Sequence, residues 1–273
     1  TYGNIHDYMS IDLDNPTPGT TAATTRRPNL KSPSAYRWHH RMACASAAII
    51  TATKHATLGM TIQQGSLESL PGLLPCEACI AGKLRKQEKP SSHSNGFTPL
   101  TNNPSTTSKF PRPAPQNQQV SLDFGICVNQ ICRKGNTCFA LYVDLGLSLL
   151  YVKCLPSRGV VVVSLLGYCQ RWGDPTMLTM DNAKEFIQGD MATEMAKRSI
   201  QANPSPPYSP NKSPTERWIG IISEGARSML YLSGLDPSKY WSDAIEARVE
   251  LQNVMASSAD PTTAIEKATG VRP

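Results

Sequence analysis

Short apolar runs and longer helical patterns alternate over the C-terminal two thirds of the chain. Runs rich in β-branched and aromatic residues predict strands at 119–127, 136–143, 149–155 and 176–180. Apolar residues recur at helical spacing in the segments 160–172, 184–200, 214–232 and 237–256. This order of strands and helices predicts an α/β domain over residues 118–273.

Both long C-terminal helical segments carry an apolar stripe. The stripe of the first contains Ile219, Ile222, Ala226, Met229 and Leu230. The stripe expected for the second contains Tyr240, Ala244, Ala247, Leu251, Val254 and Met255. Stripes of this kind predict that both helices pack against a core.

The N-terminal part divides into three segments by composition. Residues 1–35 are rich in Thr, Pro and Asn and predict a disordered leader. Residues 36–88 predict a small helical module, and residues 89–117 predict a Pro- and Ser-rich linker. Because neither end looks like a natural terminus, the sequence favours a piece of a longer polyprotein.

Charge and cysteine content narrow the class of protein. The 273 residues carry a net charge of +6, which favours a polyanionic partner, although many soluble proteins are this basic for other reasons. The chain has no apolar run of about 18 residues, so no membrane span is expected. It also shows no signal peptide, so its eight cysteines are expected to be reduced thiols or metal ligands.

Three carboxylates follow predicted rigid elements. Asp123 lies in the first strand, Asp181 directly follows the fourth, and Glu216 lies on the first turn of a core-packed helix. Together they could bind two hard divalent cations, an arrangement that stabilises the attacking and leaving oxygens in phosphoryl transfer.

Each acid also has a purely structural explanation. Asp123 could end a strand, Asp181 could cap the following helix, and Glu216 could form a capping box with Ser213. Asp144, another acid at the end of a strand, is interpreted as a turn residue. The ordered set of three, rather than any single acid, favours a catalytic site.

The N-terminal module contains residues with metal-ligand spacing. Cys76 and Cys79 form a C-x-x-C pair, whose thiolates can reach one tetrahedral zinc ion. The other two ligands could come from His39, His40, Cys44 and His55. Alternatively, the cysteines are ordinary buried residues and the histidines lie on the surface. A module of about fifty residues has little core of its own, which favours a structural metal.

Two sets of motifs resemble copia-type retrotransposon integrases, which are DDE polynucleotidyl transferases. The stretches VSLD, MDNAKEF and YSPNKSPTER, which end in or contain the three acids, resemble the motifs of the catalytic core. The stretches WHHRMAC and CEACIAGK resemble the pre-integrase zinc domain of the same elements. The likeness extends over about residues 36–273.

The resemblance implies a fold and a set of roles. The fold would be an RNase H-like core, a mixed sheet with flanking helices, preceded by a small helical zinc-binding module. Asp123, Asp181 and Glu216 would be catalytic and would bind two Mg²⁺ or Mn²⁺ ions. Zn²⁺ would be held by His39, Cys44, Cys76 and Cys79, which leaves His40 and His55 as surface residues. DNA phosphates would be contacted by Lys184, Lys212 and Arg217.

The resemblance also implies partners and a location. The partners would be the DNA ends of the element and the target DNA, and the protein would be a homo-oligomer. It would act in the nucleus after residing in a cytoplasmic virus-like particle.

Three departures from the family pattern keep other hypotheses open. Between Asp181 and Glu216 lie 34 residues, one fewer than is typical, and the usual Asn-Gly is replaced around Ser213 and Pro214. Cys44 stands where the family has a histidine. The chain could therefore be an active integrase, or a degenerate or domesticated copy that binds DNA or partners without catalysis. A third hypothesis is a zinc-dependent binding module joined to an unrelated α/β domain.

Overall fold

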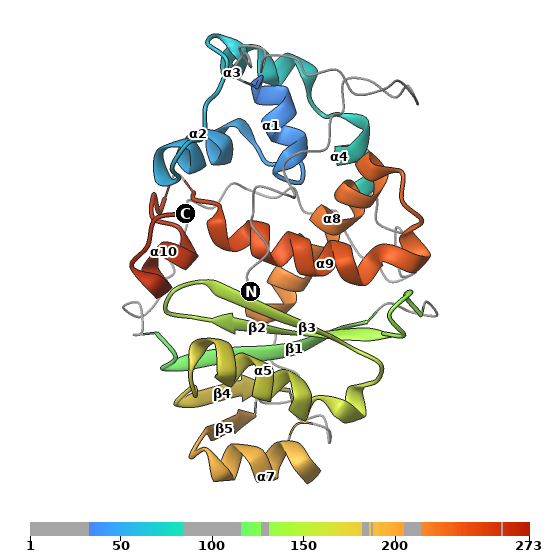
Figure 1. Ribbon diagram of the computed structural model, residues 1–273, viewed down its shortest axis with the longest axis vertical. Helices are drawn as coiled ribbons and strands as arrows, with labels where there is room; N and C mark the ends of the chain where they lie inside the picture. The colour runs from blue at the N-terminus through green and yellow to red at the C-terminus, as the bar shows by residue number, and fades with distance from the viewer. Residues whose placement is uncertain are drawn as a thin grey trace, which may run out of the picture.

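A five-stranded mixed sheet lies at the centre of the computed structural model (Figure 1). The structure describes residues 33–83, 116–126, 131–181, 186, 188–204, 214–257 and 259–273. The strands are β1 (Gln119–Ile126), β2 (Cys138–Asp144), β3 (Leu149–Leu155), β4 (Met177–Met180) and β5 (Gln201–Pro204), in the spatial order β3-β2-β1-β4-β5. The first three form an antiparallel meander, and β4 and β5 extend the sheet in parallel with β1.

Helices cover both faces of this sheet. One face packs against α5 (Val162–Trp172) and α7 (Gly189–Lys197), and the other packs against α8 (Pro214–Ser233) and α9 (Pro237–Val254) (Figure 1). Every residue of β2 is buried, because its alternating side chains enter a different core on each face. This explains why β2 is almost continuously apolar rather than alternating.

The edge strand β5 was not predicted. The helix expected to reach residue 200 ends at Lys197, and Ser199 adopts a left-handed conformation with φ of 57° that turns the chain into β5. All four residues of β5 are exposed. Its sequence, QANP, is polar and ends in proline, as suits a short edge strand but gives no strand pattern.

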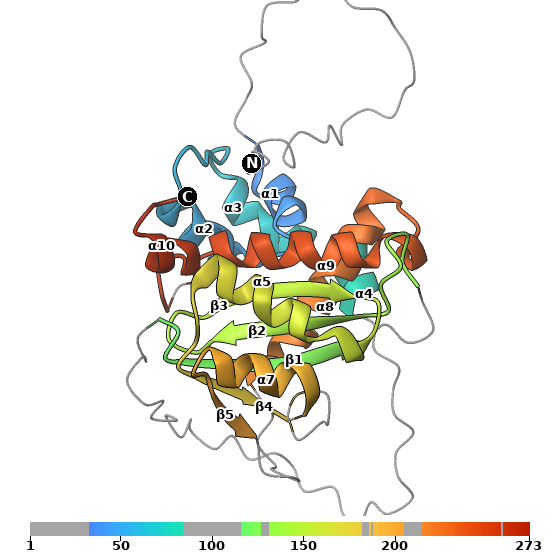
Figure 2. The ribbon, with the colours of Figure 1, turned by 60° about the horizontal axis from the view of Figure 1, so that its bottom comes forward.

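The N-terminal module forms a further layer on the side of α8 and α9 that faces away from the sheet (Figure 2). Its elements are α1 (Ala35–Arg41), α2 (Ala47–Ala56), α3 (Ser66–Ser69), η2 (Leu70–Leu73) and α4 (Glu77–Lys83). Helix α4 lies along α8, where Ser228 Oγ donates to Ala78 O at 3.0 Å and Arg227 Nε donates to Gly82 O at 2.9 Å. The module and the α/β domain therefore pack directly against each other.

Two segment boundaries, the end of the predicted leader and the end of the predicted linker, differ from those in the structure. Ala35, assigned to the leader, is fully buried as the first residue of α1. Asn117, assigned to the linker, belongs to the core: its backbone N–H donates to Asp144 at 2.7 Å, and its side chain accepts from the Tyr168 hydroxyl at 2.7 Å. At the C-terminal end, α10 (Ala264–Thr269) precedes Pro273, whose carbonyl accepts from Leu58 N at 2.8 Å.

Helix α9 buries part of the predicted stripe, including Ala244, together with residues outside it. Its buried residues include Trp241, Ala244, Ile245, Arg248 and Asn253. Asn253 Nδ2 donates to Leu150 O at 2.8 Å, and its Oδ1 accepts from Leu150 N at 2.9 Å, so one amide side chain pairs with the free edge of β3. Asn253 is buried because the helix covers a strand edge, which an apolar periodicity does not reveal. No helix among the described residues has the length and apolar character needed to cross a bilayer.

The close approach of α4 and α8 makes a testable prediction. A Cβ on Gly82 would overlap Ser228 Oγ and lie 2.7 Å from the backbone oxygen of Glu224, which cannot move aside as a side chain would. We expect Gly82→Ala to lower the free energy of unfolding by about 1–3 kcal/mol. Gly72→Ala is the matched control, because nothing lies within 4 Å of its added methyl group. Equal thermal melting curves for the two variants would contradict the packing described here.

Candidate metal centres

Two parallel strands bring Asp123 and Asp181 to the same end of the sheet. The register pairs Ser121 of β1 with Thr179 of β4. Continuing this register by two residues places Asp123 beside Asp181, which directly follows β4. Adjacent strands lie about 4.8 Å apart, so the two carboxylates emerge as neighbours.

A buried hydrogen bond holds the first turn of α8 against β1. Thr215 Oγ1 donates to Ser121 Oγ at 2.6 Å, and both side chains are buried. Ser121 and Asp123 are two residues apart on one strand and therefore face the same side of the sheet. Glu216 follows Thr215, so this contact brings the first turn of the helix, and Glu216 with it, to the side of β1 that carries Asp123.

The pKa of the Asp123 carboxyl is affected by the two other acids nearby. Burial raises the pKa of the Asp123 carboxyl, and the Asp181 and Glu216 carboxylates raise it further. The Phe124 N–H, which donates to Asp123 Oδ1 at 2.7 Å, and the Arg158 guanidinium act in the opposite direction and do not reverse the shift. A site with this excess of negative charge suits a divalent cation, which would favour the ionised carboxylates.

The acids form a looser group than the cysteine and histidine ligands described below. Among the described residues, one group of His and Cys side chains has all of its ligand atoms within 4.8 Å of one another. This group lies in the N-terminal module and does not include the three acids. Asp181 and Glu216 are both exposed, whereas Asp123 is half-buried. The carboxylates are therefore open to solvent and to a polyanionic substrate.

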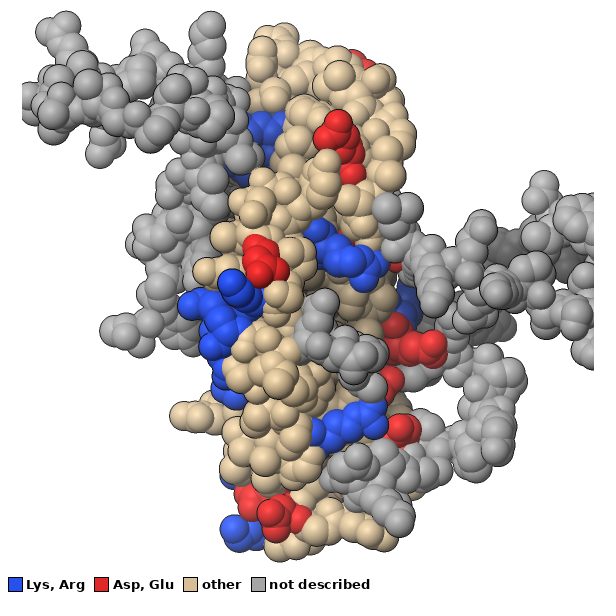
Figure 3. Space-filling view, turned by 90° about the vertical axis from the view of Figure 1, so that its right-hand side faces the viewer, with Lys and Arg blue, Asp and Glu red and all other residues tan. Residues whose placement is uncertain are grey.

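The predicted DNA contacts are only partly covered by the described residues. Arg217 is exposed on α8 next to Glu216, whereas Lys184, Lys212 and the capping residue Ser213 lie outside the described part of the chain. On the face shown in Figure 3, Lys and Arg form separate patches among Asp and Glu, not one continuous basic stripe. The net positive charge is thus not concentrated in one block on this face.

Asp144 has the structural role predicted for it. It is fully buried, and its Oδ1 accepts from Gly146 N at 2.8 Å and from Leu147 N at 3.0 Å. These bonds form the turn between β2 and β3. The prediction that Asp144 is a turn residue is therefore confirmed.

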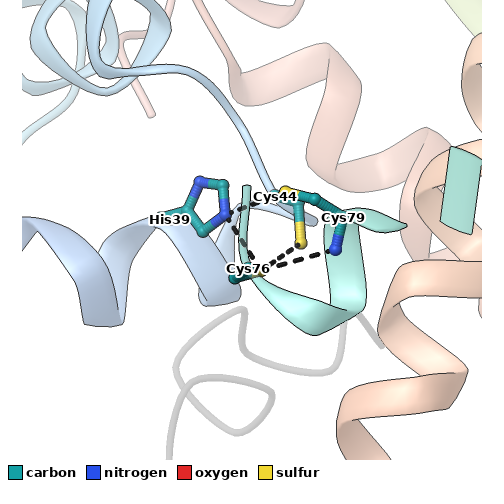
Figure 4. Close-up of side chains that lie close together, drawn as sticks. All are labelled: His39, Cys44, Cys76 and Cys79. Atoms are coloured by element: carbon teal, nitrogen blue, oxygen red, sulfur yellow. Dashed lines mark hydrogen bonds between the residues drawn. The ribbon is translucent and has the colours of Figure 1, made fainter. Parts of the chain in front are cut away.

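The four residues chosen as zinc ligands converge in the N-terminal module. Figure 4 shows His39, Cys44, Cys76 and Cys79 pointing toward one another. Cys44 Sγ and Cys76 Sγ are 3.9 Å apart, and His39 Nε2 lies 3.4 Å from Cys76 Sγ and 3.2 Å from Cys79 Sγ. Ligands around a tetrahedral zinc ion would be about 3.8 Å apart between sulfurs and about 3.5 Å apart between sulfur and nitrogen. The donor set and its spacing both fit zinc.

The backbone near α1 explains this convergence. Helix α1 ends at Arg41, and Ala43 and Cys44 then adopt left-handed conformations with φ of 52° and 63°. This turn brings Cys44 N to 2.8 Å from His39 O, so Cys44 folds back beside the last turn of α1, which carries His39. Such a conformation costs about 1–2 kcal/mol for each residue other than glycine. The contact between His39 Nδ1 and Ala45 O, at 2.7 Å, leaves Nε2 directed at the thiols.

The thiols of this group are unfavourable as anions without a cation. Burial raises the pKa of the Cys44 thiol, and the nearby Cys79 and Cys76 raise it further. Burial also raises the pKa of Cys79. A divalent cation among them would reverse this effect, because metal ligation requires thiolates.

The two other histidines considered as zinc ligands, His40 and His55, differ in exposure. His55 is exposed, as predicted. His40, also predicted to be a surface residue, is half-buried, with its ring centroid 4.4 Å from that of Tyr36 and its Nε2 buried without a hydrogen bond. Burial, followed by the proximity of His39, lowers the His40 pKa. The surface assignment of His40 was wrong because α1 is enclosed by the rest of the module.

The structure also draws attention to a residue that the sequence analysis missed. Arg158 acts on the Asp123 carboxylate, although 34 residues separate the two in the chain. Its place in the sequence, between a predicted strand and a predicted helix, carries no motif that would single it out.

Comparisons with known proteins identify the fold. No protein-family model and no curated protein matches the chain. A chain of the simian T-cell lymphotropic virus intasome, solved in complex with the PP2A regulatory subunit B56 gamma, is similar in structure. It has a TM-score of 0.54 and 15% sequence identity, and the match covers 86% of this chain and 72% of that one. The HTLV-2 integrase catalytic core domain, solved with magnesium, is similar with a TM-score of 0.46 and 17% identity, over 56% of this chain and 97% of its own.

The predicted fold class is confirmed. The chain has an RNase H-like α/β core, with a mixed sheet and flanking helices, preceded by a small helical module that contains the His and Cys group. At these identities the likeness establishes the fold alone.

Proposed function

We propose that this chain is an integrase of the copia type, which joins DNA ends to target DNA by metal-dependent strand transfer. The observation that carries the proposal is the placement of three acids at one end of the sheet. Parallel strands bring Asp123 beside Asp181, and the Ser121–Thr215 hydrogen bond brings the turn that carries Glu216 to the same side.

The roles of the acids follow from their positions. Asp123 and Asp181 would share one Mg²⁺ or Mn²⁺ ion, and Glu216 with one of the aspartates would hold a second. Two such ions supply Lewis acidity that activates a water or a DNA 3′-hydroxyl and stabilises the leaving oxygen. The exposed carboxylates of Asp181 and Glu216 leave room for a DNA backbone, and Arg217 lies beside them as a phosphate contact. Lys184 and Lys212 are proposed as further phosphate contacts from their sequence positions.

The His and Cys group is proposed as a structural zinc site. His39, Cys44, Cys76 and Cys79 supply four ligands, which fill a tetrahedral coordination sphere and leave no position for a substrate. Cys44 in place of the family's histidine retains a good zinc ligand. The zinc module would therefore organise the fold and take no part in the chemistry.

The wider context of the activity is proposed from the same resemblance. Joining the two ends of one element to a target requires at least two active sites, so the working form would be a homo-oligomer bound to DNA. The protein would act in the nucleus, after packaging in a cytoplasmic virus-like particle.

The deciding experiment is a strand-transfer assay on the wild-type chain. Fluorescently labelled duplexes with recessed 3′-hydroxyl ends are incubated with supercoiled plasmid and Mg²⁺ or Mn²⁺, and covalent joining is scored on a denaturing gel. We expect labelled plasmid that depends on the metal and disappears with a chelator. Duplex binding without joining, under either metal, would instead favour the degenerate, non-catalytic copy, whose support is the shortened segment before Glu216.

A further inference from the structure

Arg158 lies at the same end of the sheet as the three acids. It is the first residue of η3 (Arg158–Val160), which follows the end of β3. Leu155 at the end of β3 pairs with Cys138, and Cys138 pairs with Ile126 at the end of β1. The C-terminal ends of β1 and β3 therefore lie on either side of β2, and the chain leaves β3 close to where β1 presents Asp123.

One aromatic ring, that of Phe124, packs against the Arg158 guanidinium. Its Cζ lies 5.3 Å from the centroid of the Phe124 ring. Phe124 in turn stacks against Phe186, with centroids 4.8 Å apart and an interplanar angle of 13°. Phe124 is the neighbour of Asp123, and Phe186 follows Asp181 by five positions. Phe124 and Phe186 pack on the face of the sheet that α5 covers, whereas Asp123 faces α8, so the stack joins Arg158 to the chain segments of both aspartates from the opposite face.

Within the described part of the chain, the charge of Arg158 is not neutralised by a close ion pair. Among the described residues, no carboxylate lies within 4.0 Å of its guanidinium, whereas Arg133, Arg171 and Arg198 each pair with Asp or Glu. Arg158 is half-buried, and its charge acts on Asp123 without contacting it. A guanidinium packed on a ring by its face keeps its N–H edge available for an anion.

We infer that Arg158 binds a phosphate of the DNA strand at the carboxylate site and positions that strand for transfer. The inference rests on the proposed function for the identity of the substrate. A planar guanidinium offers parallel N–H donors that match two phosphate oxygens, and the ring stack fixes its plane before DNA arrives. Phosphates next to three acids need such a cation, because the carboxylates and metal ions alone do not hold the flanking backbone. Arg158 acts on position and is not a catalytic residue.

The test separates charge from stacking with two variants. Arg158→Gln keeps a planar, stackable amide and loses the charge, whereas Arg158→Lys keeps the charge and loses the planar fork. Duplex binding is measured by fluorescence anisotropy at several salt concentrations in EDTA, so that no metal-dependent step contributes. We expect Arg158→Gln to reduce the slope of log Kobs against log salt by about 0.9, the value for one phosphate contact, and Arg158→Lys to retain it.

Arg171→Gln is the matched control. Arg171 also packs on a ring, with its Cζ 5.0 Å from the Trp172 centroid, but it lies at the far end of α5 and pairs with Glu250 at 2.8 Å. Its substitution is expected to leave the salt slope unchanged. In strand transfer at saturating DNA, we expect a loss of about 10²-fold for Arg158→Gln and a smaller loss for Arg158→Lys, with melting temperatures unchanged.

The outcomes distinguish this inference from the proposed function. If the wild-type chain joins DNA and Arg158→Gln matches it in salt slope and rate, the inference is overturned and the function stands. If the wild-type chain binds DNA without joining it and Arg158→Gln still reduces the slope, the function is overturned and the phosphate contact stands. A fall in melting temperature for Arg158→Gln, with no change in slope, would assign Arg158 to packing alone. Absence of duplex binding by the wild-type chain would overturn both.

Discussion

Asp181→Asn is expected to reduce metal-dependent strand transfer by at least about 10³-fold while duplex binding in EDTA stays at the wild-type level. The reason is that asparagine keeps the size and polarity of the side chain but removes the charge that would hold a divalent cation beside Asp123. The measurement is the joining assay described above, run at several Mg²⁺ and Mn²⁺ concentrations. Activity that survives Asp181→Asn would overturn the assigned mechanism.

Asp190→Asn is the matched control for this substitution. Asp190 is an exposed acid in the first turn of α7, nine positions after Asp181, and no contact places it with the other acids. Its loss is expected to leave strand transfer unchanged. A comparable loss in both variants would point to a general effect of charge on DNA binding or folding.

Asp123→Asn is expected to abolish activity equally and to stabilise the metal-free protein. Burial and the nearby acids raise the folded-state pKa of Asp123 above its ordinary value. A raised pKa means that the folded state binds the proton more tightly than the unfolded state, so the contribution of this group to stability is lost as the pH rises. The melting temperature of Asp123→Asn should therefore exceed that of the wild type at neutral pH, and the difference should disappear in acid. A lower melting temperature at neutral pH would contradict this assignment.

Cys79→Ser is expected to release zinc and to lower the melting temperature of the whole chain by about 10 °C or more. Zinc binding free energy is folding free energy in a module with so little core of its own. The effect should extend beyond the module, because α4, which carries Cys79, packs along α8, which begins with the turn that holds Glu216. Metal content by mass spectrometry and thermal unfolding by circular dichroism provide the two measurements.

Two further variants control for this result. Cys44→His supplies another good zinc ligand at the same place and should retain about one zinc ion per chain. Cys169→Ser alters a buried cysteine of α5, remote from the His and Cys group, and should leave the zinc content unchanged. If Cys79→Ser retains zinc with wild-type stability, the group is not a metal site and its cysteines are ordinary core residues.

Local pattern was sufficient for most of the strands and long helices of this protein and for the acid, cysteine and histidine candidates. Strand β3 matches the predicted range, and β1, β2, α5 and α8 match to within a few residues, because apolar periodicity reports directly on burial. C-x-x-C spacing identified Cys76 and Cys79 as candidate metal ligands, and the family resemblance added His39 and Cys44, whose side chains the structure brings together with them. The three acids were identifiable because each stands within a motif at the end or start of a regular element.

The features that only the tertiary structure decided depend on contacts between segments that are distant in the sequence. The polar edge strand β5 is formed by pairing with β4. Helix α9 buries Arg248 and Asn253 because neighbouring elements of the fold cover these two side chains. Neither effect leaves a periodic trace in the chain. Arg158 became a candidate because folding brings a strand end to the Phe124 ring. The sequence alone therefore determined which residues can carry the chemistry, since residue type and spacing are local. Only the tertiary structure decided which of them meet, since that depends on strand register and helix packing.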